Sequence, residues 1–411
     1  MNNQIPHIGI FGKRNVGKSS FINVLCEQSV SIVSEQAGTT TDPVKKRIEL
    51  GECGPVVLID TAGIDDNGDV GEMRVAASRK VFSMIDMGII VLSNNSFDDY
   101  EREIISSLDE LNTPYIIIHN KTDISKMNQD LRKELINKYR LDESEIVEFN
   151  SLSFVYDSEN DSTNNSNREL INLISKTLPE SIFNNPTIIG DLVNYGDVVL
   201  LVTPVDKEAP KGRMILPQVQ VIRDAIDNGC IVITLRETEL EYYFNNCKLT
   251  PKLVITDSQA FAMVDAIVPK DIPLTSFSIL FARLKGDFNS FVKGTYAISN
   301  LKDNDRILIM ESCSHHTIGD DIARVKLPKW INEFTEKKLE YEVVTAFDQP
   351  STKYKSYALM IQCGGCMFTR KQIINRMQPA LKNHIPITNY GMAIAYTKGI
   401  FQRSLSPFKF I

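Results

Sequence analysis

Short apolar runs recur along the chain, and each is followed by polar or glycine-containing residues. The first runs lie at 6–11, 56–59 and 115–119. Runs of this length bounded by turn residues are typical of buried strands in a parallel sheet. Apolar residues at helical spacing occur at 20–26 and again at 168–178. The N-terminal part is therefore predicted to alternate strands with helices.

The alternation continues beyond Pro179 and Pro186, which bracket a predicted linker. Strands are predicted at 196–202, 231–234, 253–256, 306–310, 341–346 and 357–362, and helices at 218–227, 259–264, 275–284, 328–338 and 369–381. Strands that alternate with helices indicate parallel sheets. The stretch 157–167 is poor in apolar residues and is predicted to be a mobile surface insertion.

The length of the chain implies several domains, since 411 residues exceed a typical single core. We predict an α/β protein with three domains. Residues 1–178 form a phosphate-binding domain with a mainly parallel sheet, residues 179–268 a small parallel α/β domain, and residues 269–411 an α/β domain that binds metal. The middle domain has no catalytic pattern, so we assign it to association, as in a homodimer.

A glycine-rich phosphate-binding loop follows the first predicted strand. Residues 12–19 read Gly-Lys-Arg-Asn-Val-Gly-Lys-Ser and lead directly into a predicted helix, which is the context that this motif requires. Backbone N–H groups of such a loop surround phosphates, Lys18 neutralises the β- and γ-phosphates, and the Ser19 hydroxyl binds Mg²⁺. The predicted nucleotide contacts here are Gly12, Asn15, Val16, Gly17, Lys18, Ser19 and Ser20.

Two further motifs end the next strands. Asp60-Thr61-Ala62-Gly63 places a carboxylate near Mg²⁺, and the Gly63 N–H can reach the γ-phosphate. Asn120-Lys121-Thr122-Asp123 offers Asp123 to the N1–H and N2–H of guanine, donors that adenine lacks. The predicted nucleotide is therefore GTP, with Asn120 joining this loop to the phosphate loop and Lys121 covering the base.

A polar stretch between the first helix and the second strand, Gly38-Thr39-Thr40-Thr41-Asp42, is predicted to be a switch loop. We favour Thr40 as the second hydroxyl ligand of Mg²⁺, with Thr39 and Thr41 as alternatives. The predicted catalytic set comprises Lys18, Thr40, Asp60 and Gly63. Ser151 is a predicted contact of the base, although its motif, Phe149-Asn150-Ser151-Leu152, is degenerate.

These four motifs resemble those of the small GTPases, and more narrowly those of the TrmE-like tRNA-modification GTPases. Ile64 stands where Ras-type enzymes carry a water-positioning Gln. The resemblance implies another device, in which Asn15 helps to hold a K⁺ ion whose charge replaces an arginine finger. A plain turn residue is the other interpretation of Asn15.

Two cysteine motifs lie in the C-terminal part. Cys363-Gly364-Gly365-Cys366 follows one predicted strand, and Cys313-Ser314-His315-His316 follows another. Cys-x-His with Cys-x-x-Cys suits a structural zinc site of three cysteines and one histidine, and it also suits an iron–sulfur cluster held by three cysteines. Asp320, on the same loop as Cys313, offers an oxygen ligand.

Composition narrows the partners and the compartment. The net charge of −7 and the pI of about 5.5 give no indication of nucleic-acid binding. We see no signal peptide and no apolar run long enough for a bilayer, so we expect a cytoplasmic protein without a membrane partner. Of the seven cysteines, the clustered ones are expected to bind metal rather than to form disulfides in a reducing compartment.

A GTP-binding domain at one end and the cysteine motifs at the other make the chain similar, over its full length, to the FeFe-hydrogenase maturation GTPases (HydF). The resemblance implies a 4Fe–4S cluster on Cys313, Cys363 and Cys366, with His315 or Asp320 as a candidate fourth ligand. It also implies a carrier that receives a di-iron precursor, made with two radical-SAM enzymes, and delivers it to apo FeFe-hydrogenase. Many members have His before Cys-x-x-Cys, whereas this chain has Gln362.

Two other functions are weighed against the carrier. The first is a regulatory or RNA-linked GTPase with a structural zinc site of three cysteines and one histidine, which the acidic pI disfavours. The second is a redox enzyme, for which we find no flavin or nicotinamide motif. Near the end of the chain, Tyr390 and Met392 are interpreted as packing residues.

Overall fold

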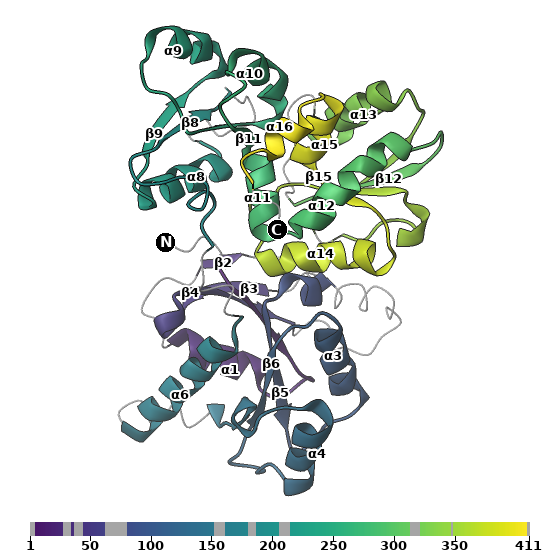
Figure 1. Cartoon of the computed structure of the whole chain (residues 1–411). Helices are drawn as coiled ribbons and strands as arrows, with labels where there is room; N and C mark the ends of the chain where they lie inside the picture. Colours follow the sequence, from purple (N-terminus) through teal and green to yellow (C-terminus); the bar gives the residue numbers. More distant parts are fainter. Residues whose placement is uncertain are drawn as a thin grey trace. The chain divides into compact units, whose positions relative to one another are not determined.

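The computed structural model describes residues 5–27, 34–36, 44–61, 80–151, 161–179, 186–204, 214–312, 321–346 and 348–408. The chain forms two compact units, Met1–Asn185 and Pro186–Ile411. Strands and helices alternate in both units, which confirms the predicted α/β class (Figure 1). None of the described helices has the length and apolar character that crossing a membrane requires.

A seven-stranded sheet forms the centre of the N-terminal unit, in the order β2-β3-β4-β1-β5-β6-β7. The parallel strands are β1 (His7–Phe11), β4 (Pro55–Asp60), β5 (Met87–Ser93), β6 (Tyr115–Asn120) and β7 (Ile146–Glu148). The antiparallel pairings are those of β2 (Ser34–Gln36) with β3 (Val44–Glu49) and of β3 with β4. Every residue of β5 and β6 is buried, as expected for central strands covered on both faces.

Among the described residues, the helices that pack around this sheet include α1 (Lys18–Glu27), α3 (Asp99–Glu110), α4 (Gln129–Tyr139) and α6 (Asp161–Thr177) (Figure 1). Phe21 and Leu25 of α1 share one apolar core with Leu170 and Ile174 of α6. Because α6 begins at Asp161, part of the predicted mobile insertion is helical. The buried turns of α6 provide the nucleus for helix formation. Extending an existing helix by further polar residues costs little free energy, which explains why the polar stretch from Asp161 is helical.

The second unit contains two separate parallel sheets. The first, in the order β11-β10-β8-β9, comprises β8 (Val198–Val202), β9 (Ile231–Leu235), β10 (Leu253–Thr256) and β11 (Leu274–Ser276), with helices α8 (Leu216–Asp227), α9 (Leu240–Asn246) and α10 (Phe261–Ile267). The predicted helix at 275–284 is wrong at its start, because Ser276 ends β11 and caps α11 (Phe277–Lys285). This sheet therefore extends past residue 268, and the predicted domain boundaries stay predictions.

The other sheet has the order β13-β12-β14-β15, with β12 (Arg306–Glu311), β13 (Glu340–Thr345), β14 (Leu359–Gln362) and β15 (Ile387–Asn389). Its helices are α12 (Phe288–Thr295), α13 (Leu327–Thr335), α14 (Arg370–Lys382), α15 (Tyr390–Thr397) and α16 (Phe401–Leu405). The strand order reverses between β12 and β14, since β13 lies on one side of β12 and β14 on the other. Ligands of such sheets bind outside the carboxyl ends of the strands at the reversal point.

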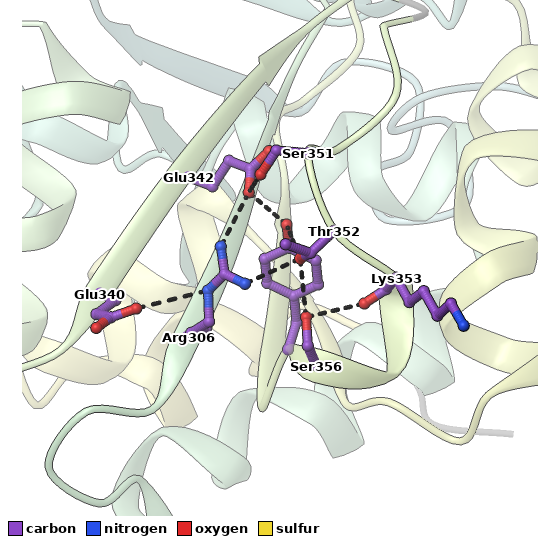
Figure 2. A network of polar contacts seen from close by, with 8 residues as sticks. Arg306, Glu340, Glu342, Ser351, Thr352, Lys353 and Ser356 are labelled. Carbon is purple, nitrogen blue, oxygen red and sulfur yellow. Dashed lines mark hydrogen bonds and ion pairs between the residues drawn. The ribbon is translucent and has the colours of Figure 1, made fainter. Parts of the chain in front are cut away.

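A polar network fixes the opposite, amino-terminal end of this sheet (Figure 2). Arg306, at the start of β12, donates to Thr352 Oγ1 at 2.9 Å. The same guanidinium lies 3.4 Å from Glu342 Oε2 and 3.6 Å from Glu340 Oε2. Glu342 accepts in turn from the Ser351 hydroxyl at 2.8 Å. The network attaches the β13–β14 connection to the sheet, which leaves the carboxyl ends for a functional site.

Candidate nucleotide and metal sites

The phosphate loop connects β1 to α1 in the N-terminal unit. Lys18, the first residue of α1, is buried, and its Nζ donates to the carbonyl oxygens of Gly12 and Lys13, the latter at 2.9 Å. The side chains of Asn15 and Ser19 are exposed. The backbone thus holds the ammonium group inside the loop until a phosphate offers stronger, charge-assisted hydrogen bonds.

A second loop holds the phosphate loop in place. Nδ2 of Asn120, the last residue of β6, donates to the Val16 carbonyl at 3.0 Å. Nζ of Lys121 donates to the Asn15 carbonyl at 2.6 Å. Gly17 has a φ of 95°, and a Cβ built there would lie 2.3 Å from Asn120 Nδ2. Glycine is therefore required where the two loops meet.

The other described motif residues lie near the same strand ends. Asp60 ends β4 and is the register partner of Ile10 in β1. Asp123 is exposed, as a residue that binds a base must be before the base arrives. Ser151 donates its amide and its hydroxyl to Asn120 Oδ1, at 3.2 and 3.0 Å. Ser151 therefore positions Asn120, and its contact with a base stays a prediction.

Two predicted catalytic residues, Thr40 and Gly63, lie outside the described residues, as does Ile64. Their roles stay predictions, like the nucleotide contacts of the described residues. What the structure adds is the support of the phosphate loop from β6 and from Ser151.

In the second unit, the Cys-x-x-Cys motif forms the turn between β14 and α14. Gly365 has a φ of 62°, and a Cβ there would lie 2.3 Å from Ile373 Cδ1, so this position also requires glycine. Lys285 of α11 is buried beside the turn. Its Nζ donates to three carbonyl oxygens of the turn, at Gly365 (3.0 Å), Cys366 (3.1 Å) and Phe368 (2.7 Å). Burial lowers the pKa of Lys285 to about 8, although both nearby cysteines raise it in part.

Cys363 lies where β12 and β14 end side by side. Its sulfur accepts from the Ser312 amide at 3.1 Å, and its thiol donates to the Ser312 hydroxyl at 2.8 Å. Nε2 of Gln362 lies 3.7 Å from the same sulfur. Burial raises the pKa of the Cys363 thiol, whereas Ser312 and Arg376 lower it in part. The sulfur thus has donors around it that would also stabilise a thiolate.

Sequence reasoning missed Arg376 and interpreted Tyr390 as a packing residue. Arg376 bonds to Gln362, which precedes this cysteine, and Tyr390 follows Asn389, the register partner of Gln362. Arg376 of α14 is 7% exposed and Tyr390, the first residue of α15, is 9% exposed. Arg376 Nε donates to Gln362 Oε1 at 3.3 Å. Arg376 Nη1, Arg376 Nη2 and the Tyr390 hydroxyl have no hydrogen-bond partner among the described residues. The packing interpretation of Tyr390 accounts for its ring but not for its hydroxyl.

The described chain includes Cys363 and Cys366 of the predicted ligand set, whereas Cys313, His315 and Asp320 lie outside the described residues. Within the described ranges, no three Cys, His, Asp or Glu side chains are grouped to hold a metal ion. The described chain does reach Ser312, the residue before Cys313, in contact with the Cys363 sulfur.

These residues fit an iron–sulfur cluster. Cys363 and Cys366 belong to one turn, and the unpartnered guanidinium N–H groups of Arg376 are suited to an anionic group such as a cluster with thiolate ligands. Both ends of the Gln362 side-chain amide have partners: Oε1 accepts from Arg376, and Nε2 faces the Cys363 sulfur. It therefore supports the cysteine at the position where many members of the resembled family have His.

Three family models match the chain. The 50S ribosome-binding GTPase matches residues 7–121, the hydrogen maturase F dimerization domain matches residues 188–286, and the hydrogen maturase F tetramerization domain matches residues 289–407. The first match confirms the GTPase domain predicted from the motifs. The other two extend across most of the second unit, including both of its sheets.

Curated relatives match the N-terminal part. GTPase Der of Wolinella succinogenes is 36% identical over 138 residues, which is 32% of this chain and 29% of the relative. The tRNA modification GTPase MnmE of Staphylococcus haemolyticus is 40% identical over 130 residues, 31% of this chain and 28% of the relative. The chain spans less than a third of the length of these relatives. The MnmE match confirms the resemblance to tRNA-modification GTPases for this domain.

Similar solved structures include Era of Aquifex aeolicus, at 21% identity and a TM-score of 0.33, covering 57% of this chain and 93% of Era. The G domain of the T. maritima FeoB iron transporter has 17% identity and a TM-score of 0.29, covering 42% of this chain and 99% of that domain. Similarity at this level carries no functional conclusion.

Proposed function

We propose that this chain, which belongs to the hydrogen maturase F (HydF) family, is a GTP-hydrolysing carrier that receives a di-iron precursor and delivers it to apo FeFe-hydrogenase. Two family-specific domains in the second unit and a GTPase domain in the first support this proposal. The observation that carries it is the Cys-x-x-Cys turn at the reversal point of a parallel sheet, beside a buried cation that has unpartnered donors.

GTP binds the phosphate loop in this proposal. Lys18 moves from the carbonyl oxygens of the loop to the β- and γ-phosphates, and the exposed Asp123 accepts from guanine. Ser19 and Thr40 would hold Mg²⁺ by their hydroxyl groups together with the Asp60 carboxylate, and the ion would offset the negative charge of the phosphates. The Gly63 amide would donate to the γ-phosphate while water attacks the γ-phosphorus, the bond to the β–γ bridging oxygen breaks, and GDP and inorganic phosphate leave.

Hydrolysis in a protein with Ile64 requires another source of positive charge, for which we propose K⁺ held by Asn15. Replacing K⁺ with Na⁺ at constant ionic strength is expected to lower GTP turnover, by about tenfold or more if K⁺ supplies a full stabilising contact. Steady-state phosphate release measures this. Asn15→Ala should abolish the difference between the two ions, and equal turnover of the wild type in both would rule out the potassium role.

Cys313, Cys363 and Cys366 would hold a 4Fe–4S cluster, which when bound supplies an iron with an exchangeable coordination position for the cargo. His315 and Asp320 are the candidate fourth ligands. Lys285 holds the carbonyl groups of the turn so that both sulfurs keep their place. A di-iron precursor made by two radical-SAM enzymes is the substrate of this transfer.

Self-association, first as a homodimer, is part of the proposal. Among the described residues β9 is an edge strand of its sheet and pairs with β8 alone. Ile231 of β9 is 50% exposed, Tyr195 beside Gly229 is 90% exposed, and Ile226 of α8 is 54% exposed. An open strand edge with apolar neighbours favours association with another chain. The matched dimerization domain includes all three side chains.

The test is anaerobic purification followed by iron, sulfide and zinc analysis and a hydrogenase-activation assay with the two radical-SAM partners. We expect about four irons and four sulfides per chain for one 4Fe–4S cluster, and hydrogenase activity that depends on this chain. Stoichiometric zinc without iron would overturn the carrier function and would leave a GTPase with a structural zinc site.

A further inference from the structure

Arg376 is a buried cation whose charge requires an explanation. A guanidinium stays protonated at every physiological pH and offers five N–H donors. Only its Nε has a partner among the described residues, the Oε1 of Gln362 at 3.3 Å, while Nη1 and Nη2 are buried and unpartnered. A buried charge with unmet donors is costly in free energy, so such a group is suited to an anionic ligand that accepts hydrogen bonds.

Nearby carboxylates are engaged elsewhere. Glu311 at the end of β12 and Asp321 both pair with Arg324, at 2.8 and 2.6 Å. Neither these two carboxylates nor Asp348 forms a hydrogen bond with Nη1 or Nη2 of Arg376. The cation therefore keeps donors for another acceptor.

The position of Arg376 is fixed from two sides. The guanidinium lies over the Phe368 ring, with 5.3 Å from Cζ to the ring centroid, and Phe368 belongs to the Cys-x-x-Cys turn. Through Gln362 the cation is linked to the Cys363 sulfur, because Oε1 of Gln362 accepts from Arg376 while Nε2 faces the sulfur at 3.7 Å. Such stacking and bridging hold the group ready for a ligand before it binds.

We propose that Arg376 and Tyr390, here called the donor pair, bind the sulfur atoms of an iron–sulfur cluster held at Cys363 and thereby stabilise its reduced form. The inference rests on the proposed function, since it requires the cluster. Tyr390 adds a buried hydroxyl that has no partner among the described residues, and it comes from a different helix that begins directly after Asn389, the register partner of Gln362. Both residues would contact the cluster itself, and neither needs to touch the cargo.

The test compares reduction potentials of the cluster. Reduction adds negative charge, which a nearby cation and hydrogen-bond donors favour, so losing them lowers the potential. For Arg376→Met we expect the equilibrium constant for reduction of the cluster to fall about tenfold, which lowers the reduction potential by about 59 mV for one electron. Tyr390→Phe should shift it in the same direction by less. Redox titration followed by EPR measures both, on the full-length protein.

Lys382→Met is the matched control, because it removes one positive charge from the exposed far end of the same helix. Its potential should equal that of the wild type. Tyr390→Phe keeps the test valid if Arg376→Met fails to fold. Wild-type potentials in both donor-pair variants, at full iron content, would overturn the inference and leave the carrier proposal intact. A wild type without iron would overturn both.

Discussion

Lys18→Ala is expected to lower GTP turnover by about 10²- to 10³-fold, the usual cost of losing a group that stabilises charge in the transition state. Lys18 is the buried cation of the phosphate loop, and its Nζ is already oriented by the carbonyl groups of Gly12 and Lys13. Alanine at the first position of a helix is well tolerated, so the fold should persist. Phosphate release at saturating GTP measures the effect, with nucleotide affinity determined separately.

The matched control is Lys133→Ala, which removes an exposed lysine from α4. It should leave turnover at the wild-type value. Iron content should be unchanged in both variants, because the phosphate loop and the cysteine turn belong to different compact units. A Lys18→Ala protein that is folded but has lost its iron would contradict the independence of the two sites.

The sequence predicted the features that depend on local pattern. The strand before the phosphate loop, the strand that ends at Asn120 and the strand that delivers Cys363 all form close to where apolar runs indicated them. The helix after the cysteine turn also forms, capped by Thr369. These elements are specified by their own residues, through burial of apolar runs and through capping side chains.

Features that depend on distant residues could not be predicted in this way. Lys285 of α11 and Arg376 of α14 contact the cysteine turn, and Tyr390 begins α15 next to the end of β14. The residue spacing within one helix does not reveal which side chains the other helices bring. Thr275 and Ser276 illustrate the same limit, since pairing with β10 places them in a strand although they adjoin a helical pattern. Tertiary pairing here overrides the local preference.

The C-terminal domain was predicted only as a metal-binding domain, whereas the matched family model describes tetramerization. The two roles are compatible within one fold, because the cysteine turn occupies the carboxyl ends of β12 and β14 and leaves other surfaces for association. The spacing of metal-binding residues along a sequence carries no information about which surface binds another subunit. The sequence pattern was therefore informative about the site and silent about this part of the assembly.

Cys363→Ser should remove the iron–sulfur cluster, with iron and sulfide falling by about tenfold or more, since even the loss of a supporting group around a metal costs 10- to 100-fold. A serine hydroxyl is a harder ligand than a thiolate and does not deprotonate as readily. The substitution keeps the size of the side chain, and Ser312 can hydrogen-bond to an oxygen as it does to the sulfur. The fold should therefore persist.

Cys247→Ser is the control, because Cys247 is an exposed free cysteine after α9. It should retain full iron, full hydrogenase activation and wild-type GTP turnover. Cys363→Ser should lose the first two and keep the third, as the GTPase domain lies in the other unit. Full iron content in Cys363→Ser would mean that the metal is held elsewhere, and the carrier proposal would lose the residue on which it depends.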